Sequence, residues 1–239
     1  MSKVTPYKNS KSKKEQVITM FDNIAESYDF LNHSLSLGMD KVWRKKAIKK
    51  LSNNPKSILD IATGTGDFAI SAAKYTQAQI TGIDISKRML DVGIKKIKQK
   101  KLNTRITLQK ADSENLPFNN NSFDAITAGF GVRNFDNLSK GLSEMYRVLT
   151  INGMVVILEP STPKYFPLKQ LYNLYFHHIL PTIGYWISKD KNAYKYLPKS
   201  VDAFPSGDKF ISKLEESGFK ECEYFSLTFG IVSLYIAIK

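Results

Sequence analysis

The chain has 239 residues, of which 42% are hydrophobic, so it can build a core and is too apolar for a disordered protein. Lys and Arg outnumber Asp and Glu by 35 to 22, a net charge of +13. This balance favours an anionic partner, whether nucleic acid, a phospholipid surface or a small molecule, or else serves only solubility. The single cysteine, Cys222, excludes a disulfide framework and a cysteine-based zinc cluster.

The first part of the chain predicts a basic tail followed by helices. Residues 1–14 are lysine-rich and predict a flexible tail, and residues 15–239 predict a single domain. Residues 15–51 have a helical pattern that Gly38 interrupts. We expect helices before the first strand.

Short apolar runs then alternate with helical patterns, which predicts a parallel sheet covered by helices on both faces. Five strands are expected at residues 57–62, 78–84, 105–112, 123–130 and 154–160. Helices are expected at residues 67–75, 87–100 and 138–149, the second of them capped by Ser86. Two further strands, 221–227 and 231–239, flank a short turn, which forces an antiparallel pair. The expected fold class is therefore α/β, with a mostly parallel seven-stranded sheet.

Residues 164–204 are unusually aromatic for a connection in such a fold. They hold 10 of the 28 aromatic residues in about a sixth of the chain, and ordinary connections are far shorter. The density suits either the packing of an inserted helical pair or an apolar wall over a ligand. We expect this insertion to do both, as a helical lid.

The stretch "SILDIATGTGDFAISAAK", residues 57–74, ends its apolar run in a glycine turn. Its spacing Gly64-x-Gly66-x-x-Ala69 fits nicotinamide dinucleotides and other nucleotide-like ligands equally well. Asp60 is expected to face the ligand, where it would repel a pyrophosphate and attract the ammonium and sulfonium groups of S-adenosylmethionine (SAM). Thr65 is expected to bind the same ligand, whose carboxylate can use N–H groups at the helix start.

Acidic residues follow the second and third expected strands. Asp84 can accept two hydrogen bonds from ribose hydroxyls, which suits both NAD and SAM; alternatively it is a helix N-terminal charge near Ser86. Asp112 can accept from an adenine amino group, and the backbone of Ser113 can bind the ring edge. These positions predict an adenosine site at the carboxyl ends of the strands.

Four segments in order, "LDIATGTGD", "GIDIS", "ADSENLPFNNNSFD" and "RVLTINGMVVILE", resemble the class I SAM-dependent methyltransferases, which have a Rossmann-like fold. "YDFLNHSLSLGMDKVW", "GFGVRNF" and "RVLTINGMVVILEPSTP" resemble the UbiE/MenG family of quinone-biosynthesis C-methyltransferases from about residue 21 onward. The chain departs from that family at Leu31, Asp40, "TING" (150–153) and Pro160. Gly129 stands where some members have a SAM-contacting Ser, so that contact cannot be carried over.

The resemblance implies C-methylation of a polyprenylated quinol in menaquinone biosynthesis (2-demethylmenaquinol to menaquinol), ubiquinone biosynthesis or both. Arg133 would stabilise a phenolate or orient a water; its alternative role is a loop-bracing ion pair. Asn134 would bind a ring oxygen and Tyr28 would close over the site, although a structural role fits Tyr28 equally. No metal is expected, because His33, His177 and His178 have no metal-binding context.

The implied partners are a polyprenyl quinol and an anionic membrane surface, on the inner face of the cytoplasmic membrane. We expect peripheral binding through the lysines of the tail and of residues 95–101. A homodimer is left open, and nucleic acid is not expected, since neither a base-amino motif nor a cysteine nucleophile is in place. The alternatives are a small-molecule or RNA methyltransferase of the same fold and a non-catalytic SAM-binding partner.

Overall fold

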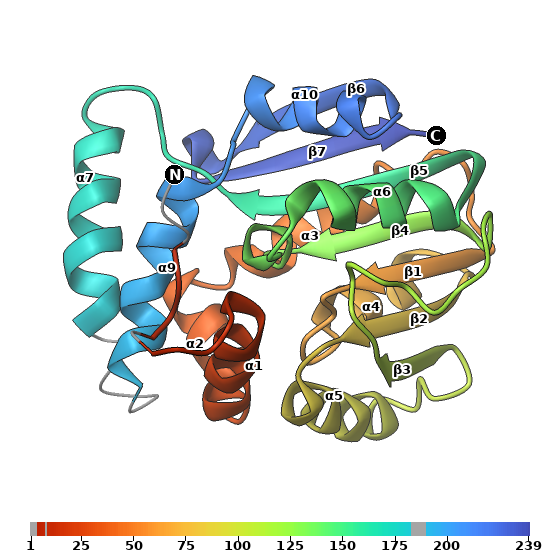
Figure 1. Cartoon of the computed structure of the whole chain (residues 1–239), viewed down its shortest axis with the longest axis horizontal. Helices are drawn as coiled ribbons and strands as arrows, with labels where there is room; N and C mark the ends of the chain where they lie inside the picture. Colours follow the sequence, from red (N-terminus) through yellow and green to blue (C-terminus); the bar gives the residue numbers. More distant parts are fainter. Residues whose placement is uncertain (1–3, 8, 183–189) are drawn as a thin grey trace.

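Seven strands form one twisted sheet in the computed structural model, which describes residues 4–7, 9–182 and 190–239 (Figure 1). Their order is β3-β2-β1-β4-β5-β7-β6. The first five are parallel, and β7 is antiparallel to both of its neighbours. Their bounds are β1 Ser57–Ile61, β2 Gln79–Asp84, β3 Ile106–Lys110, β4 Phe123–Gly129, β5 Leu149–Pro160, β6 Lys220–Leu227 and β7 Val232–Ile238. The predicted mostly parallel seven-stranded sheet is confirmed.

The helices confirm most of the sequence pattern. Ser86 caps α5 as predicted, its hydroxyl accepting from the Met89 N–H. β5 begins at Leu149, five residues before its expected start, so the "TING" segment lies within the strand. The helices are α1 Lys13–Ile24, α2 Tyr28–Leu35, α3 Met39–Ile48, α4 Asp67–Tyr75, α5 Lys87–Gln99, η1 Val132–Asn134, α6 Leu138–Val148, α7 Leu168–Leu174, η2 Tyr175–Ile179, α9 Lys191–Ala203, α10 Asp208–Glu216 and η3 Thr228–Gly230.

The N-terminal segment differs from the predicted tail. α1 starts at Lys13, inside the expected tail, because Ser12 and Glu15 form a capping box that satisfies the first turn. Upstream, Pro6 is buried and the Tyr7 hydroxyl donates to Asp190 at 2.6 Å. Residues 4–7 and the start of α1 therefore pack on the rest of the protein, whereas residues 9–12 are exposed. The helical stretch that follows also breaks a second time, between α1 and α2.

Each face of the sheet buries its own hydrophobic core because successive strand residues point to opposite faces. Ile58 faces the core made with α3 and α4, and Leu59 faces the core made with α6 and α10. Both residues are fully buried. Helices on both faces confirm the layered arrangement expected from the alternation of strands and helices.

A third hydrophobic core joins the N-terminal helices to the insertion. Leu31 of α2 is fully buried there with residues of α1, α7, η2 and α9. Figure 1 shows α9 beside α1 and α2, with α7 on its outer side. The helical insertion is thus confirmed, and two of its aromatics, Tyr185 and Trp186, lie outside the described residues. Within the described ranges, no helix has the length and apolar character needed to cross a membrane.

Gly93 of α5 lets this helix approach the glycine turn. An added Cβ would lie 2.7 Å from Leu108 Cδ1 and 3.0 Å from the backbone carbonyl carbon of Thr65. We therefore expect Gly93→Ala to lower the free energy of unfolding, although Ala gains about 1 kcal/mol over Gly in a helix. Overpacking costs about 1–3 kcal/mol and outweighs that gain. Urea denaturation measures the change, with exposed Lys98→Ala as the control; a more stable Gly93→Ala variant would contradict the close approach.

Candidate active site

A pocket opens at the carboxyl edge of the parallel strands, where the strand order reverses between β1 and β4. Ligands bind at such switch points in open α/β sheets. Four of the sequence-predicted cofactor residues line the pocket together: Gly64, Asp84, Asp112 and Ser113. The sequence thus identified one wall of a real cavity.

Asp84 ends β2 and holds the glycine turn. Its carboxylate accepts from the Gly64 N–H at 2.9 Å and from the Ser86 N–H at 2.8 Å. Burial raises the pKa of Asp84 to about 6, although these backbone N–H groups lower it. Gly64 itself has φ +56°, a backbone conformation that favours glycine. The carboxylate and the turn therefore form one unit that faces the pocket.

The opposite wall comes partly from α1, which sequence reasoning did not place there. Lys14 Nζ lies 2.7 Å from Asp112 and 3.2 Å from Glu114. Burial raises the pKa of Asp112, but Lys14 and the Glu114 N–H outweigh it and hold the pKa below its usual value. Val17 and Phe21 of α1 also line the pocket. The spacing of Val17 and Phe21 predicts an amphipathic helix, but it does not predict that this helix packs against the pocket.

Asp60 does not face the pocket as expected. Its carboxylate is fully buried and accepts from the hydroxyls of Thr63 at 2.5 Å and Thr127 at 2.7 Å. Burial raises its pKa to about 6. Neither Thr65 nor Gly66 lines the pocket: Thr65 donates to Asp29, and Gly66 is the N-cap residue of α4 with φ +81°. Of the glycine turn, Gly64 lines the pocket, whereas Asp60, Thr65 and Gly66 lie outside its lining.

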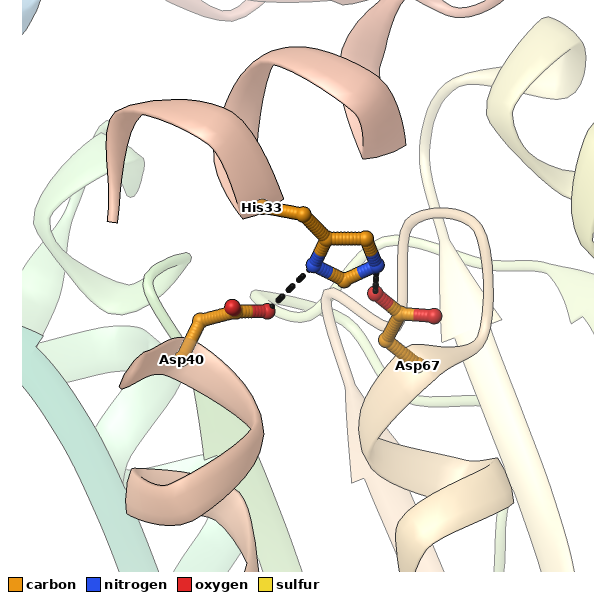
Figure 2. Close-up of side chains that lie close together, drawn as sticks. All are labelled: His33, Asp40 and Asp67. Carbon is orange, nitrogen blue, oxygen red and sulfur yellow. Dashed lines mark hydrogen bonds and ion pairs between the residues drawn. The ribbon is translucent and has the colours of Figure 1, made fainter. Parts of the chain in front are cut away.

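A charged cluster ties the N-terminal helices to the start of α4 (Figure 2). His33 of α2 lies between two carboxylates, with Nδ1 2.7 Å from Asp40 and Nε2 3.6 Å from Asp67. This grouping resembles a metal site, yet Arg44 pairs with Asp40, and Lys96 lies 2.6 Å from Asp67. The two cations already compensate the carboxylates, so the cluster works as an ion-pair network. Sequence reasoning missed it because its members come from four helices.

A second, larger cavity of about 490 Å³ lies next to the pocket. Its lining is mostly apolar and comes from the N-terminal helices and the insertion, including Met20, Ile24, Leu35, Trp43, Tyr172, Phe176, Leu180, Tyr194 and Leu197. Tyr172 and Phe176 stack with their ring centroids 4.8 Å apart. The aromatic insertion therefore forms the predicted apolar wall as well as a core.

Four residues line both cavities and mark their junction: Phe21, Tyr28, Phe130 and Asn134. The amide nitrogen of Asn134 is buried without a hydrogen-bond partner among the described residues, while its oxygen accepts from the Tyr196 hydroxyl at 3.1 Å. Burial raises the pKa of Tyr28, although Asn32 and the charge of Arg133 lower it. A buried amide that lacks a partner needs an explanation, and a bound ligand supplies one.

Arg133 lines the apolar cavity with its charge already paired. Its Nη1 lies 3.0 Å from the carboxylate of Glu159, which is fully buried at the end of β5. The guanidinium also donates to the Phe130 carbonyl and to Ser200. Burial raises the pKa of Glu159 even though Arg133 opposes the shift. The bracing ion pair therefore exists, and it lies beside the junction of the cavities.

The β4 loop reaches that junction through a second close approach. A Cβ added at Gly131 would lie 2.4 Å from the Cβ of Ala62, which follows β1. The loops after β1 and β4 can therefore touch only because position 131 is glycine. "GFGVRNF" is the sequence signal for this contact, although its partner cannot be read from the segment itself.

Comparison with known proteins assigns the chain to a family. The model of the ubiE/COQ5 methyltransferase family matches residues 9–239. The chain belongs to the ubiE/COQ5 methyltransferase family. A demethylmenaquinone methyltransferase of Bacteroides fragilis is 50% identical over 239 residues, covering 99% of this chain and 98% of its own. A second one, of Porphyromonas gingivalis, is 44% identical over 240 residues, with the same coverage.

Solved structures extend the likeness to the fold. A protein of Methanococcus maripaludis, provisionally assigned as an S-adenosyl-L-methionine-dependent methyltransferase, superposes with a TM-score of 0.68. It is 21% identical, and the match covers 98% of this chain and 96% of the other. Identity this low supports the Rossmann-like methyltransferase fold alone. The resemblance to the class I fold noted in the sequence is confirmed.

The pKa of Asp84 generates a test of the pocket. Because that pKa is about 6, we expect SAM affinity to fall as the pH drops through 6, where the carboxylate takes up a proton and loses an acceptor. Asp84→Asn should bind SAM about 1.5–3 kcal/mol more weakly and lose this pH step. Calorimetry between pH 5 and 8 measures both.

Asp60→Asn is the matched control for Asp84→Asn. Asp60 has the same raised pKa of about 6 but lies behind the turn, so this variant should keep the step. An unchanged pH profile in Asp84→Asn would remove Asp84 from the ligand site.

Proposed function

We propose that the protein is a SAM-dependent C-methyltransferase that converts a polyprenylated demethylmenaquinol-type ring to the methylated quinol. The observation that carries this proposal is the pair of adjoining cavities, which meet at Tyr28, Phe130 and Asn134. The first lies at the carboxyl edge and has carboxylates in its wall, and the second is mostly apolar. A methyl donor in the first and an apolar acceptor in the second would meet at that junction. The names of the B. fragilis and P. gingivalis relatives support the same substrate class.

The residues around the first pocket fit SAM. Asp84 would accept from the ribose, Asp112 and Ser113 would hold the adenine, and the Gly64 backbone leaves room for close approach. Bound there, SAM supplies a sulfonium methyl group, which a ring carbon takes while the S–C electron pair returns to sulfur and one ring proton is released. The chain's own residues then have to orient the ring, exclude water and stabilise the phenolate.

Asn134 would bind the ring. Its buried amide nitrogen has an N–H to donate, and the Tyr196 hydroxyl fixes the amide from the other side. Donation to a ring oxygen would satisfy this amide and place the adjacent ring carbon toward the donor pocket. Tyr28, on the same boundary, would close the junction against water. Asn134 and Tyr28 would together hold the ring in place for methyl transfer.

Arg133 would stabilise the phenolate through its field. The guanidinium lines the acceptor cavity, and its charge lowers the pKa of Tyr28 and of Tyr196 against the effect of burial. The same charge would favour an ionised ring hydroxyl. The carboxylate of Glu159 lies 3.0 Å from Arg133 and neutralises part of its charge. We therefore expect the contribution of Arg133 to turnover to lie near the lower end of such electrostatic effects.

Methyl transfer tests the function directly. Purified protein with SAM and a short-chain demethylmenaquinol is expected to give the methylated product, detected by mass spectrometry. The matching benzoquinol and total RNA are offered in parallel, and Asp84→Asn serves as the low-affinity control. Methylation of RNA alone would support an RNA methyltransferase of the same fold instead. SAM binding with no product from any acceptor would support a non-catalytic partner.

A double substitution separates the two roles of Arg133. Arg133→Gln alone leaves Glu159 buried without its partner and should destabilise the fold by about 3–5 kcal/mol. Arg133→Gln combined with Glu159→Gln should restore most of that stability. We expect the double variant to bind SAM normally and to turn over short-chain quinol about 10²-fold more slowly. Turnover near that of the wild type would reduce Arg133 to a bracing residue.

A further inference from the structure

Helix α7 has an apolar face that points away from the cavity it helps to line. Tyr172 is buried against the third core, whereas Leu168, Leu171 and Leu174 are 37%, 60% and 55% exposed. These three leucines occupy one side of the helix at a spacing of three residues. Figure 1 shows α7 as the outermost helix of the insertion. A helix that is apolar on two faces has more apolar surface than its own fold covers.

The segment that leads into α7 extends this surface. Tyr165 is 77% exposed and Phe166 is 81% exposed. Exposed apolar residues are ordinary when scattered singly, but a continuous set of large ones marks an interaction site. We call this set the outer face; it consists of Tyr165, Phe166, Leu168, Leu171 and Leu174.

The outer face continues to the mouth of the apolar cavity. Tyr175, the first residue of η2, lines that cavity, and its hydroxyl donates to the Leu35 carbonyl at 2.9 Å. Two residues further along, Leu37 also lines the cavity and is 90% exposed. The opening is therefore bordered by apolar side chains from both the N-terminal helices and the insertion.

The stretch of sequence that contains the outer face carries only positive charge. Between Glu159 and Asp190 the sequence has no Asp or Glu. Lys164 and Lys169 are both exposed and flank the aromatic pair that precedes α7. Two of the lysines expected to bind a membrane form ion pairs within the protein: Lys14 pairs with Asp112 and Glu114, and Lys96 pairs with Asp29 and Asp67. A positive apolar surface is complementary to anionic lipid.

We propose that the outer face inserts into the headgroup boundary of an anionic bilayer, so that the apolar cavity opens onto the lipid. This inference rests on the proposed function, because the prenylated quinol that this function uses as its substrate dissolves in lipid. Moving such a tail through water would cost about 0.8 kcal/mol per exposed CH₂. A cavity that opens at the bilayer surface lets the ring reach Asn134 while the tail stays in apolar surroundings.

Vesicle flotation tests the inserted face. Wild-type protein should float with phosphatidylglycerol-containing vesicles, and Leu171→Ser combined with Leu174→Ser should lower the vesicle affinity at least tenfold. Ile151→Ser is the matched control: Ile151 is 75% exposed near the opposite end of β5, so its loss should leave flotation unchanged. Equal flotation of the leucine variant and the wild type would overturn the proposal.

Charge reversal tests the flanking lysines. The double variant Lys164→Glu with Lys169→Glu should lose the preference for phosphatidylglycerol over neutral phosphatidylcholine. The control is Lys98→Glu with Lys101→Glu, at exposed positions in α5 and just after it, and this variant should keep the preference. Loss of the preference in the second pair alone would place the membrane contact on α5 and overturn the proposal.

Two further measurements distinguish a membrane contact from a dimer contact and from a failure of the proposed function. The leucine variant should keep wild-type SAM affinity and wild-type turnover of a short-chain quinol in detergent-free solution, and lose turnover of a long-chain quinol held in vesicles. Sedimentation that shows a wild-type dimer and a monomeric leucine variant, with equal flotation, would make the outer face a contact between two copies instead. Normal flotation with no quinol methylation would refute the proposed function and leave the membrane contact standing.

Discussion

The third hydrophobic core is the constraint on which the site depends. At the carboxyl edge of the sheet, the loops that follow β1 to β4 supply only part of the pocket wall. The N-terminal helices and the insertion both lie over that edge, and they bury Leu31, Phe176 and Val201 against one another. Because neither group covers its apolar face by itself, the two stabilise each other. The walls of both cavities follow from that one packing event.

Two buried ion pairs then fix the elements around the apolar cavity. Asp40 with Arg44, and Glu159 with Arg133, are pairs with almost no exposure. Such pairs add little net stability, since their desolvation offsets their attraction, but they penalise any arrangement that separates them. The His33 network fixes the N-terminal helices against α4, and the Arg133 pair fixes the β4 loop against β5. The junction between the cavities lies between these two fixed points.

The sequence predicted what depends on neighbouring residues. Strand alternation, the Ser86 cap and the glycine turn all follow from local pattern, and the structure confirms them. The orientation of Asp60 could not be predicted, because Thr127 lies 67 positions away and holds the carboxylate behind the turn. The outer wall of the pocket was equally hidden: the spacing of α1 indicates an apolar face, but nothing within α1 names Asp112 as the partner of Lys14. Long-range pairing, rather than propensity, decides these points.

The Lys14 contact ties α1 to the segment after β3, at the wall of the first pocket. Lys14, Val17 and Phe21 of α1 line the first pocket, and Met20, Phe21 and Ile24 of the same helix line the apolar cavity. Helix α1 therefore borders both cavities. Any displacement of α1 would reshape the donor and acceptor sites together, and it would break the two Lys14 ion pairs and part of the third core.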